Sequence, residues 1–397
     1  MTSMTMMAEK KSVLFLLRDF ERGGIPRVML NLVEHIDLSK YTIDIFCGNP
    51  VGIFRGCIPQ NVRLLKTNLF LRAVMCNLAK ESGIFLIFAM LIKTIRKMIQ
   101  KIFHYDILNN INKNIICSLK NREYDVIWAC AEGLPSIWSR AAGGGCKKII
   151  WIHNDYSWEC ARGDKVENTD FSIFDSIVCV SEATRKNFNS IYPEYERKTE
   201  VLYNLLNETE IIRMSEENTP ELEEYDGFKI FSIGRFSFQK NFEAIPKIAA
   251  EIILAGQSNF RWYIIGNGGA SETAAIKNAI SEYHVGNNCV LLGEQANPYK
   301  YLKKADLFVL PSRYESYPTV INEAKLLGIP VVSSVFNGAD EILDDKNGVI
   351  LPVEKFSDAI ANLINKPEQL QAWKMNKFHV DTDAIISKFY EIIHGEK

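Results

Sequence analysis

The chain has 397 residues, enough for two or three domains with sizeable cores. Apolar residues make up 47% and charged residues 24%, which excludes a largely disordered chain, a collagen-like chain and a coiled-coil rod. The formal net charge of −2 gives no reason to expect a nucleic-acid partner. Charge is nevertheless uneven, since residues 51–120 carry 11 basic and 2 acidic side chains. This basic segment indicates that only the first half of the chain meets an anionic surface.

The nine cysteines form no Cys-x-x-Cys pair and show no zinc-ligand spacing. The apolar neighbours of Cys47, Cys130 and Cys179 predict buried, reduced thiols in a cytoplasmic protein. The apolar run Val13–Leu17 is too short for the core of a signal peptide. A membrane-spanning helix needs about 20 apolar residues, and no stretch reaches that length.

Short apolar runs alternate with helical patterns along the whole chain. Runs that are apolar on both faces are typical of buried parallel strands, and the alternation predicts doubly wound α/β sheets. The predicted strands are Val13–Leu17, Thr42–Cys47, Val62–Lys66, Asp125–Cys130, Lys148–His153, Ser176–Val180, Lys229–Ile233, Trp262–Ile265, Val290–Leu292, Asp306–Leu310, Pro330–Ser333 and Val349–Leu351. Six strands lie on each side of residue 205, so we expect two domains, 1–205 and 206–380, joined through the acidic stretch 207–227.

An amphipathic helix is predicted over Phe88–Phe103, where apolar residues recur at i, i+3, i+4 and i+7. Its other face is basic. The segment is either an ordinary surface helix with a solvated basic face or an interfacial helix on anionic lipid. We favour the membrane because the helix lies within the basic segment. The basic residues are Lys93, Arg96, Lys97 and Lys101.

Three loops that follow predicted strands carry the chemistry. In the first, Gly23 and Gly24 precede a helix expected at Val28–His35, and residues without a Cβ let a ligand approach the backbone. A plain turn explains this pair equally well.

In the second loop, Arg235 and Lys240 follow the strand Lys229–Ile233. Two cations at the carboxyl end of a parallel strand suit a diphosphate, although a solvated basic pair is the alternative.

The third loop runs from Leu310 to Ala324. Pro318 fits the first turn of a helix, and Glu323 lies one turn beyond Thr319 on the same face. Glu315 lies just before the helix. Carboxylates on both sides of a helix N-terminus can hold two hydroxyl-bearing parts of one ligand while the N–H groups hold an anion. This arrangement suits a nucleotide sugar.

Glu315 and Glu323, with seven residues between them, match the Glu-x-x-x-x-x-x-x-Glu motif of retaining GT-B glycosyltransferases. The chain resembles glycosyltransferase family 4, of the bacterial surface-polysaccharide type. Further matching segments are Gly23–Leu32, Ile233–Asn241, Ile265–Gly269, Asn337–Ile342 and Asn347–Pro352. The resemblance implies an α/β GT-B fold: two Rossmann-like doubly wound parallel-sheet domains facing across a cleft. It also implies that a C-terminal helix, 381–397, crosses back onto the first domain.

The resemblance implies roles for individual residues. Arg235 and Lys240 would clamp the donor diphosphate, Glu315 would contact the transferred sugar, and Glu323 would accept hydrogen bonds from the ribose. His153 would lie near the sugar, with Asp155 as a candidate partner. The rest of the donor site would comprise Gly23, Gly24, Gly234, Gly266, Gly268, Gly293, Glu294, Tyr317, Thr319 and Val320.

The expected function is therefore retaining hexosyl transfer from a nucleotide diphosphate sugar, with UDP favoured, to a glycan or lipid-linked acceptor. The nucleotide sugar is a substrate, so no cofactor is expected, and no metal, because the cationic clamp supplies the charge stabilisation. Expected partners are this donor, the acceptor and an anionic membrane on the inner face of the plasma membrane. The alternatives are a nucleotide-sugar epimerase of the same fold and a non-catalytic, membrane-associated partner subunit.

Overall fold

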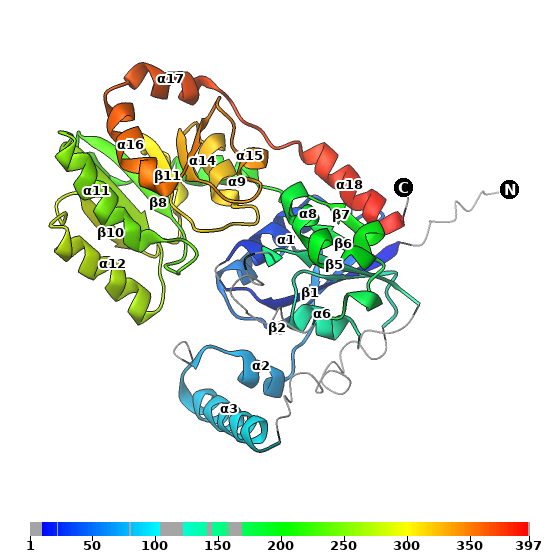
Figure 1. The fold of residues 1–397 in the computed structure, drawn as a ribbon. Coiled ribbons are helices and arrows are strands. Elements are labelled where there is room, and N and C mark those ends of the chain that lie inside the picture. Colours follow the sequence, from blue (N-terminus) through cyan, green and yellow to red (C-terminus); the bar gives the residue numbers. More distant parts are fainter. Residues whose placement is uncertain are drawn as a thin grey trace. The chain divides into compact units, whose positions relative to one another are not determined.

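The computed structural model describes residues 10–395, except 22, 79–80, 104–121, 141–144, 157 and 159–168. The chain divides into two compact units (Figure 1). Unit 1 comprises residues up to Val180, Thr184–Leu205 and the C-terminal segment from Thr382. Unit 2 comprises Ser181–Ala183 and Leu206–Asp381. The acidic stretch 207–227 therefore lies in unit 2, where it forms the helices α9 (Glu208–Ser215) and α10 (Pro220–Glu223).

Within the described residues, unit 1 contains a parallel seven-stranded sheet in the order β3-β2-β1-β4-β5-β6-β7. The strands are β1 (Lys11–Asp19), β2 (Tyr41–Asn49), β3 (Arg63–Leu64), β4 (Val126–Ala129), β5 (Lys147–Ile152), β6 (Ser176–Cys179) and β7 (Thr199–Val201). The first six correspond to predicted apolar runs, whereas β7 was not predicted. The cysteines Cys47, Cys130 and Cys179 are fully buried in this sheet, as expected, and burial raises the pKa of the Cys47 and Cys130 thiols.

The described helices of unit 1 are α1 (Gly24–Glu34), α2 (Leu69–Met75), α3 (Gly83–Phe103), α6 (Leu134–Ser139), α8 (Glu182–Ile191) and α18 (Thr382–His394). The C-terminal helix α18 packs into the core of this unit: the Phe389 ring lies 5.2 Å from Trp128 and 6.5 Å from Phe15. Tyr41 and His394 share a hydrogen bond of 2.8 Å at the end of the same helix.

Helix α3 contacts the rest of unit 1 through α2, which lies between α3 and the sheet (Figure 1). Ala89 is fully buried, and Phe85 and Ile92 pack with it against Ala73 and Cys76. The opposite side of α3 is apolar and exposed. Its residues, with their exposed fractions, are Ile84 (87%), Ile87 (69%), Phe88 (36%), Leu91 (58%), Ile95 (42%), Met98 (56%) and Ile102 (62%).

Within the described residues, unit 2 contains a parallel six-stranded sheet in the order β10-β9-β8-β11-β12-β13. The strands are β8 (Phe228–Ile233), β9 (Phe260–Ile265), β10 (Cys289–Gly293), β11 (Leu307–Leu310), β12 (Val331–Ser334) and β13 (Gly348–Leu351). The remaining helices are α11 (Ile245–Leu254), α12 (Ala270–Glu282), α13 (Tyr299–Leu302), α14 (Thr319–Leu326), α15 (Ala339–Ile342), α16 (Phe356–Ile364) and α17 (Pro367–Met375). Apolar side chains on both faces of the sheet form two cores, which is why the strands are apolar on both sides.

Candidate active site

The strand order of unit 2 reverses between β8 and β11, and open α/β sheets bind ligands at such a switch point, beyond the carboxyl ends of the strands. Two of the predicted loops lie there. The loop after β8 carries Arg235 and Lys240, and the loop after β11 carries Glu315. The fold therefore brings together residues that lie about 75 positions apart in the sequence.

Lys240 and Glu315 form an ion pair with 2.5 Å between Nζ and Oε1. Both side chains are largely buried, with exposed fractions of 16% and 6%. The Ser312 hydroxyl donates to the same Glu315 oxygen at 2.6 Å. Gln239 Nε2 donates to the other carboxylate oxygen at 3.2 Å. The buried carboxylate is thus neutralised and hydrogen-bonded on both oxygens, which fixes its orientation.

Backbone and amide hydrogen bonds join the two loops directly. The Arg313 N–H donates to the Gln239 carbonyl at 2.8 Å, and Asn241 Nδ2 donates to the Pro311 carbonyl at 3.1 Å. Asn241 has a left-handed backbone with φ of 56°, which asparagine tolerates better than most residues. The loops therefore form one rigid edge. Gln239 and Ser312 were not predicted, since a hydrogen-bonding partner so distant in sequence leaves no local pattern.

Glycines allow the close approach of the β8 and β9 loops. A Cβ on Gly266 would lie 1.8 Å from the Gly234 carbonyl oxygen, and one on Gly268 would lie 2.4 Å from the Phe236 carbonyl oxygen. A Cβ on Gly234 would lie 3.3 Å from Lys240 Cε. These three predicted glycines therefore share a packing role beside the cationic loop. Arg235 is exposed on the same loop.

Helix α14 begins at Thr319. Pro318 is its N-cap, whereas the sequence placed this proline in the first turn of the helix. The N–H groups of Thr319 and Val320 are in the first turn and lack acceptors inside the helix. Glu323 is 8% exposed. Burial raises the pKa of Tyr317, whose hydroxyl accepts a hydrogen bond from Asn322 Nδ2 at 3.3 Å.

The remaining donor-site predictions lie at other strand ends. Gly293 ends β10 with φ of +68°, and Glu294 follows it with an exposed side chain. In unit 1, Gly23 is the exposed N-cap of α1, and Gly24 is its first residue, so the helix begins four residues earlier than expected. A Cβ on Gly24 would meet no atom within 4 Å, so no neighbouring atom restricts this position to glycine.

His153 follows β5 in unit 1, at the carboxyl edge of the sheet. Burial lowers the pKa of His153 to about 3, so the ring is neutral near pH 7. Glu132, which was not predicted as a site residue, accepts hydrogen bonds from the N–H groups of His153 and Asn154. The expected partnership of Asp155 with His153 is not observed in the described contacts. Asp155 instead accepts a hydrogen bond from Asn187 Nδ2 at 3.0 Å.

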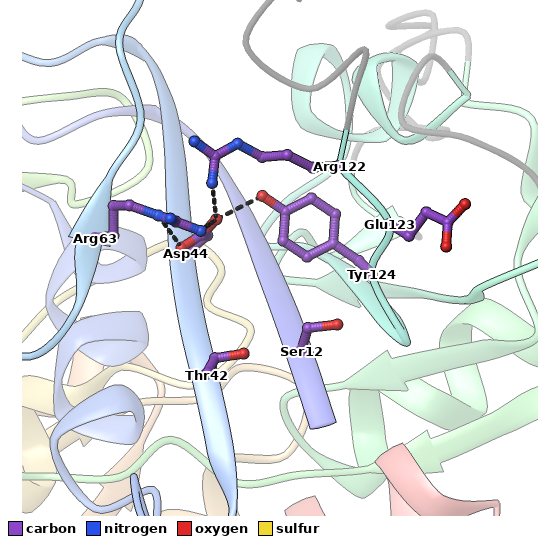
Figure 2. Close-up of a pocket in the computed structure, with 7 residues that line it drawn as sticks. All are labelled: Ser12, Thr42, Asp44, Arg63, Arg122, Glu123 and Tyr124. Carbon is purple, nitrogen blue, oxygen red and sulfur yellow. Dashed lines mark hydrogen bonds and ion pairs between the residues drawn. The ribbon is translucent and has the colours of Figure 1, made fainter. Parts of the chain in front are cut away.

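A pocket lies at the opposite, amino edge of the unit 1 sheet, and ion pairs between its lining residues hold strands together (Figure 2). Asp44 on β2 is bound by Arg63 at 2.6 Å and Arg122 at 3.4 Å and accepts a hydrogen bond from the Tyr124 hydroxyl at 2.6 Å. This carboxylate raises the pKa of Arg63, whereas the pKa of Tyr124 is raised first by burial and then by its hydrogen bond to Asp44. Asp44 thereby ties β2 to β3 and to the segment that enters β4.

Comparisons with known proteins agree with this geometry. Residues 214–380 match the model of the family Glycosyl transferases group 1. An amylovoran biosynthesis glycosyltransferase of Erwinia amylovora is 24% identical over 174 residues, 42% of this chain and 48% of that protein. An N-acetylgalactosaminyltransferase of Campylobacter jejuni, which is named for a diphospho-undecaprenol acceptor, is 26% identical over 190 residues, 47% and 49% of the two chains. The chain thus spans about half the length of the curated relatives it matches.

The likeness to solved structures covers both units. Anabaena Alr3699/HepE in complex with UDP has a TM-score of 0.63 at 18% identity, and the alignment covers 97% of this chain and 100% of that one. The fold is therefore GT-B, with two Rossmann-like parallel-sheet domains, and the predicted fold class is confirmed. None of the helices in the described part of the chain is long and apolar enough to span a bilayer. Nor do the described His, Cys, Asp and Glu side chains form a group of three suited to a metal ion.

Proposed function

We propose that the protein is a retaining glycosyltransferase that moves a hexose from a UDP-sugar to a glycan or lipid-linked acceptor in the synthesis of a bacterial cell-surface polysaccharide. The pairing of Lys240 with Glu315 at the unit 2 switch point carries this proposal. It lies within the residues that match Glycosyl transferases group 1. The names of the relatives, for amylovoran synthesis and for a lipid-diphosphate acceptor, support the acceptor class, and the UDP complex of HepE supports the donor.

The proposed chemistry follows from the charges. The bond between the anomeric carbon and the β-phosphate oxygen breaks, and negative charge grows on that oxygen. Lys240, held by Glu315, and Arg235 on the same loop stabilise this charge. The acceptor hydroxyl attacks the same face of the sugar and passes its proton to the leaving phosphate. Glu315, held by Ser312, accepts hydrogen bonds from the sugar hydroxyls. Because the two cations supply the stabilisation, the reaction needs no metal.

A screen of UDP-sugars with lipid-linked acceptors tests the proposal, with UDP release, product mass and anomeric configuration as readouts. We expect free UDP and an acceptor that is one hexose heavier, with the configuration of the donor retained. A changed nucleotide sugar without UDP release would identify an epimerase instead, and neither product would favour a partner subunit. EDTA should leave the rate unchanged, and a loss that a divalent ion restores would contradict metal independence.

We further propose that α3 attaches the protein to the anionic inner face of the plasma membrane. Its outward side is a continuous apolar stripe, and the helix contains no acidic residue. Lys97 and Lys101 are exposed on the flank of the stripe. Lys93 is directed inward, since its Nζ donates to the Cys76 carbonyl at 2.6 Å. Two copies of so basic a helix would repel each other, whereas an anionic lipid surface complements it.

Sedimentation with vesicles tests this contact. The wild type should bind phosphatidylglycerol vesicles, and binding should weaken with salt, because salt screens the lysines. Replacing Leu91, Ile95 and Met98 by Gln should abolish binding, whereas Lys97→Gln with Lys101→Gln should remove only the preference for anionic lipid. Thr94→Gln, on an exposed polar position of α3, is the control. Unchanged sedimentation of the triple variant, or a dimer that the triple variant dissociates, would refute the membrane contact.

A further inference from the structure

The unit 1 sheet has a switch point of its own, between β1 and β4. The strand next to β4 on the other side is β5. Glu132 lies three residues beyond β4, and His153 lies one residue beyond β5. Parallel strands end at the same edge of a sheet, so both residues lie at the carboxyl edge, where such sheets bind ligands.

The Glu132 side chain holds the turn that carries His153. Its Oε1 atom accepts the His153 N–H at 3.3 Å and the Asn154 N–H at 3.2 Å, and Oε2 lies 3.4 Å from the His153 nitrogen. Glu132 is 7% exposed. Burying a carboxylate to this degree is costly unless hydrogen bonds satisfy its oxygens. The hydrogen bonds from the two backbone N–H groups do so, and they also fix the backbone of the turn.

The His153 ring packs against Trp151, with ring centroids 5.0 Å apart. The Nε2 atom is buried and has no hydrogen-bond partner among the described residues. A buried polar atom without a partner calls for an explanation, and a ligand hydroxyl is a suitable partner for a neutral imidazole nitrogen.

We propose that Glu132 is a positioning residue, which fixes the turn after β5 so that His153 Nε2 can hydrogen-bond a hydroxyl of the bound sugar. This inference rests on the proposed glycosyltransferase function. Displacing a substrate contact by about 1 Å costs on the order of 100-fold in rate. We therefore expect Glu132→Leu, which has no acceptor atoms, to lower kcat/KM by roughly 10- to 100-fold.

The conservative variant provides a rescue. Glu132→Gln retains one carbonyl oxygen, and in the structure the single atom Oε1 accepts from both N–H groups. This variant should therefore stay within a few-fold of the wild type. Glu123→Gln, an exposed position at the amino edge of the same sheet, is the control. If Glu132→Leu does not fold, Glu132→Ala replaces it, and unchanged UDP binding by unit 2 verifies that the rest of the protein is intact.

Two measurements separate positioning from a purely structural role. In the first, NMR of protein labelled on its six histidines follows the His153 ring, which is assigned by its loss in His153→Gln. Glu132→Leu should shift or broaden this signal, and Glu132→Gln should not. This arm needs no substrate, so it can succeed even if no sugar is transferred and the proposed function fails. An unchanged ring signal in Glu132→Leu would overturn the proposal.

The second measurement is a double-mutant cycle on kcat/KM. Adding Glu132→Leu to His153→Ala should cause no further loss, because the residue that Glu132 positions is already gone. Independent, multiplicative losses would mean that Glu132 acts by another route, and the proposal would be wrong.

Discussion

Lys240 forms a largely buried ion pair with Glu315. A substitution at Lys240 therefore affects both catalysis and folding stability, and the two effects have to be measured separately. Under the proposed mechanism, Lys240→Ala should lower kcat by roughly 10²–10³, because that mechanism loses a fixed charge opposite the leaving phosphate. It also leaves a buried carboxylate without its cation. Arg235→Ala is therefore the companion variant, since Arg235 is exposed, and a similar loss of rate is expected with unchanged stability. Steady-state kinetics and thermal unfolding measure both effects.

Lys247 provides the control for these substitutions. It is exposed on α11 and pairs only weakly, at 3.8 Å, with Glu251 one turn away. Lys247→Ala should retain full activity. Wild-type turnover in a folded Lys240→Ala protein would exclude this lysine from the catalytic site.

The neutral His153 ring predicts sensitivity to acid. Its pKa is lowered to about 3, whereas the unfolded chain takes up a proton near pH 6.5. The unfolded state therefore binds more protons below pH 6.5, and the free energy of unfolding falls as the pH falls. The loss from this residue should reach about 2 kcal/mol at pH 5. Urea unfolding at pH 7.5 and 5 should show a smaller difference in His153→Gln than in the wild type.

His284→Asn is the control for this pH effect. His284 is exposed, and its left-handed backbone is one that asparagine tolerates. This variant should retain the acid sensitivity of the wild type. An equal pH dependence in His153→Gln would show that the buried ring is not its source.

Local spacing identified only part of the candidate site. Lys240 and Glu315 could be found because each lies just beyond an apolar strand, where ligands bind. Glu132 could not be found, since its partners are backbone N–H groups that β5 brings alongside β4 from 21 positions further on. Gln239 and Ser312 escaped prediction for the same reason. Roles that depend on contacts between distant segments have no signature in sequence spacing.

At the scale of elements, apolar runs predicted the central strands well because both faces of each sheet are covered. The strand β7 escaped prediction, since it has three residues, includes Glu200 and lies at the sheet edge. Helix α1 begins at Gly24, and the prediction placed its start at Val28 because the segment Gly-Ile-Pro has little helix propensity of its own. For α3, the periodicity of apolar residues predicted the helix but not which of its sides packs against the rest of unit 1. The inward side is set by Ala89 and Ile92 against α2.

Asp44 links β2 to β3 and to the segment that enters β4, and the substitution Asp44→Asn tests how much this link stabilises unit 1. Arg63, Arg122 and the Tyr124 hydroxyl converge on this buried carboxylate (Figure 2). Losing the charge should lower the free energy of unfolding by about 2–3 kcal/mol, because two cations are left without their counter-ion. Chemical denaturation measures this change. Glu123→Gln, whose side chain is directed away from Asp44 in Figure 2, should change stability by less than about 0.5 kcal/mol.

At the scale of the whole molecule, Phe389 on α18 tests the independence of the two units. Its side chain is fully buried against Trp128 and Phe15 of unit 1. Phe389→Ala should destabilise unit 1 by about 3–5 kcal/mol. In calorimetry, one unfolding transition should move to lower temperature. The transition that UDP raises, which we assign to unit 2, should stay in place, and a shift of both together would mean that the units unfold as one.

The return of α18 to unit 1 has a consequence for the order in which the protein is made. Unit 2 is inserted into unit 1, since residues 206–381 are translated before the helix that completes the first core. While unit 2 can fold as it leaves the ribosome, the nascent unit 1 must wait with Phe15 and Trp128 uncovered until residues 382–394 emerge. Chaperones that shield apolar surface on nascent chains should therefore bind unit 1 throughout the synthesis of unit 2.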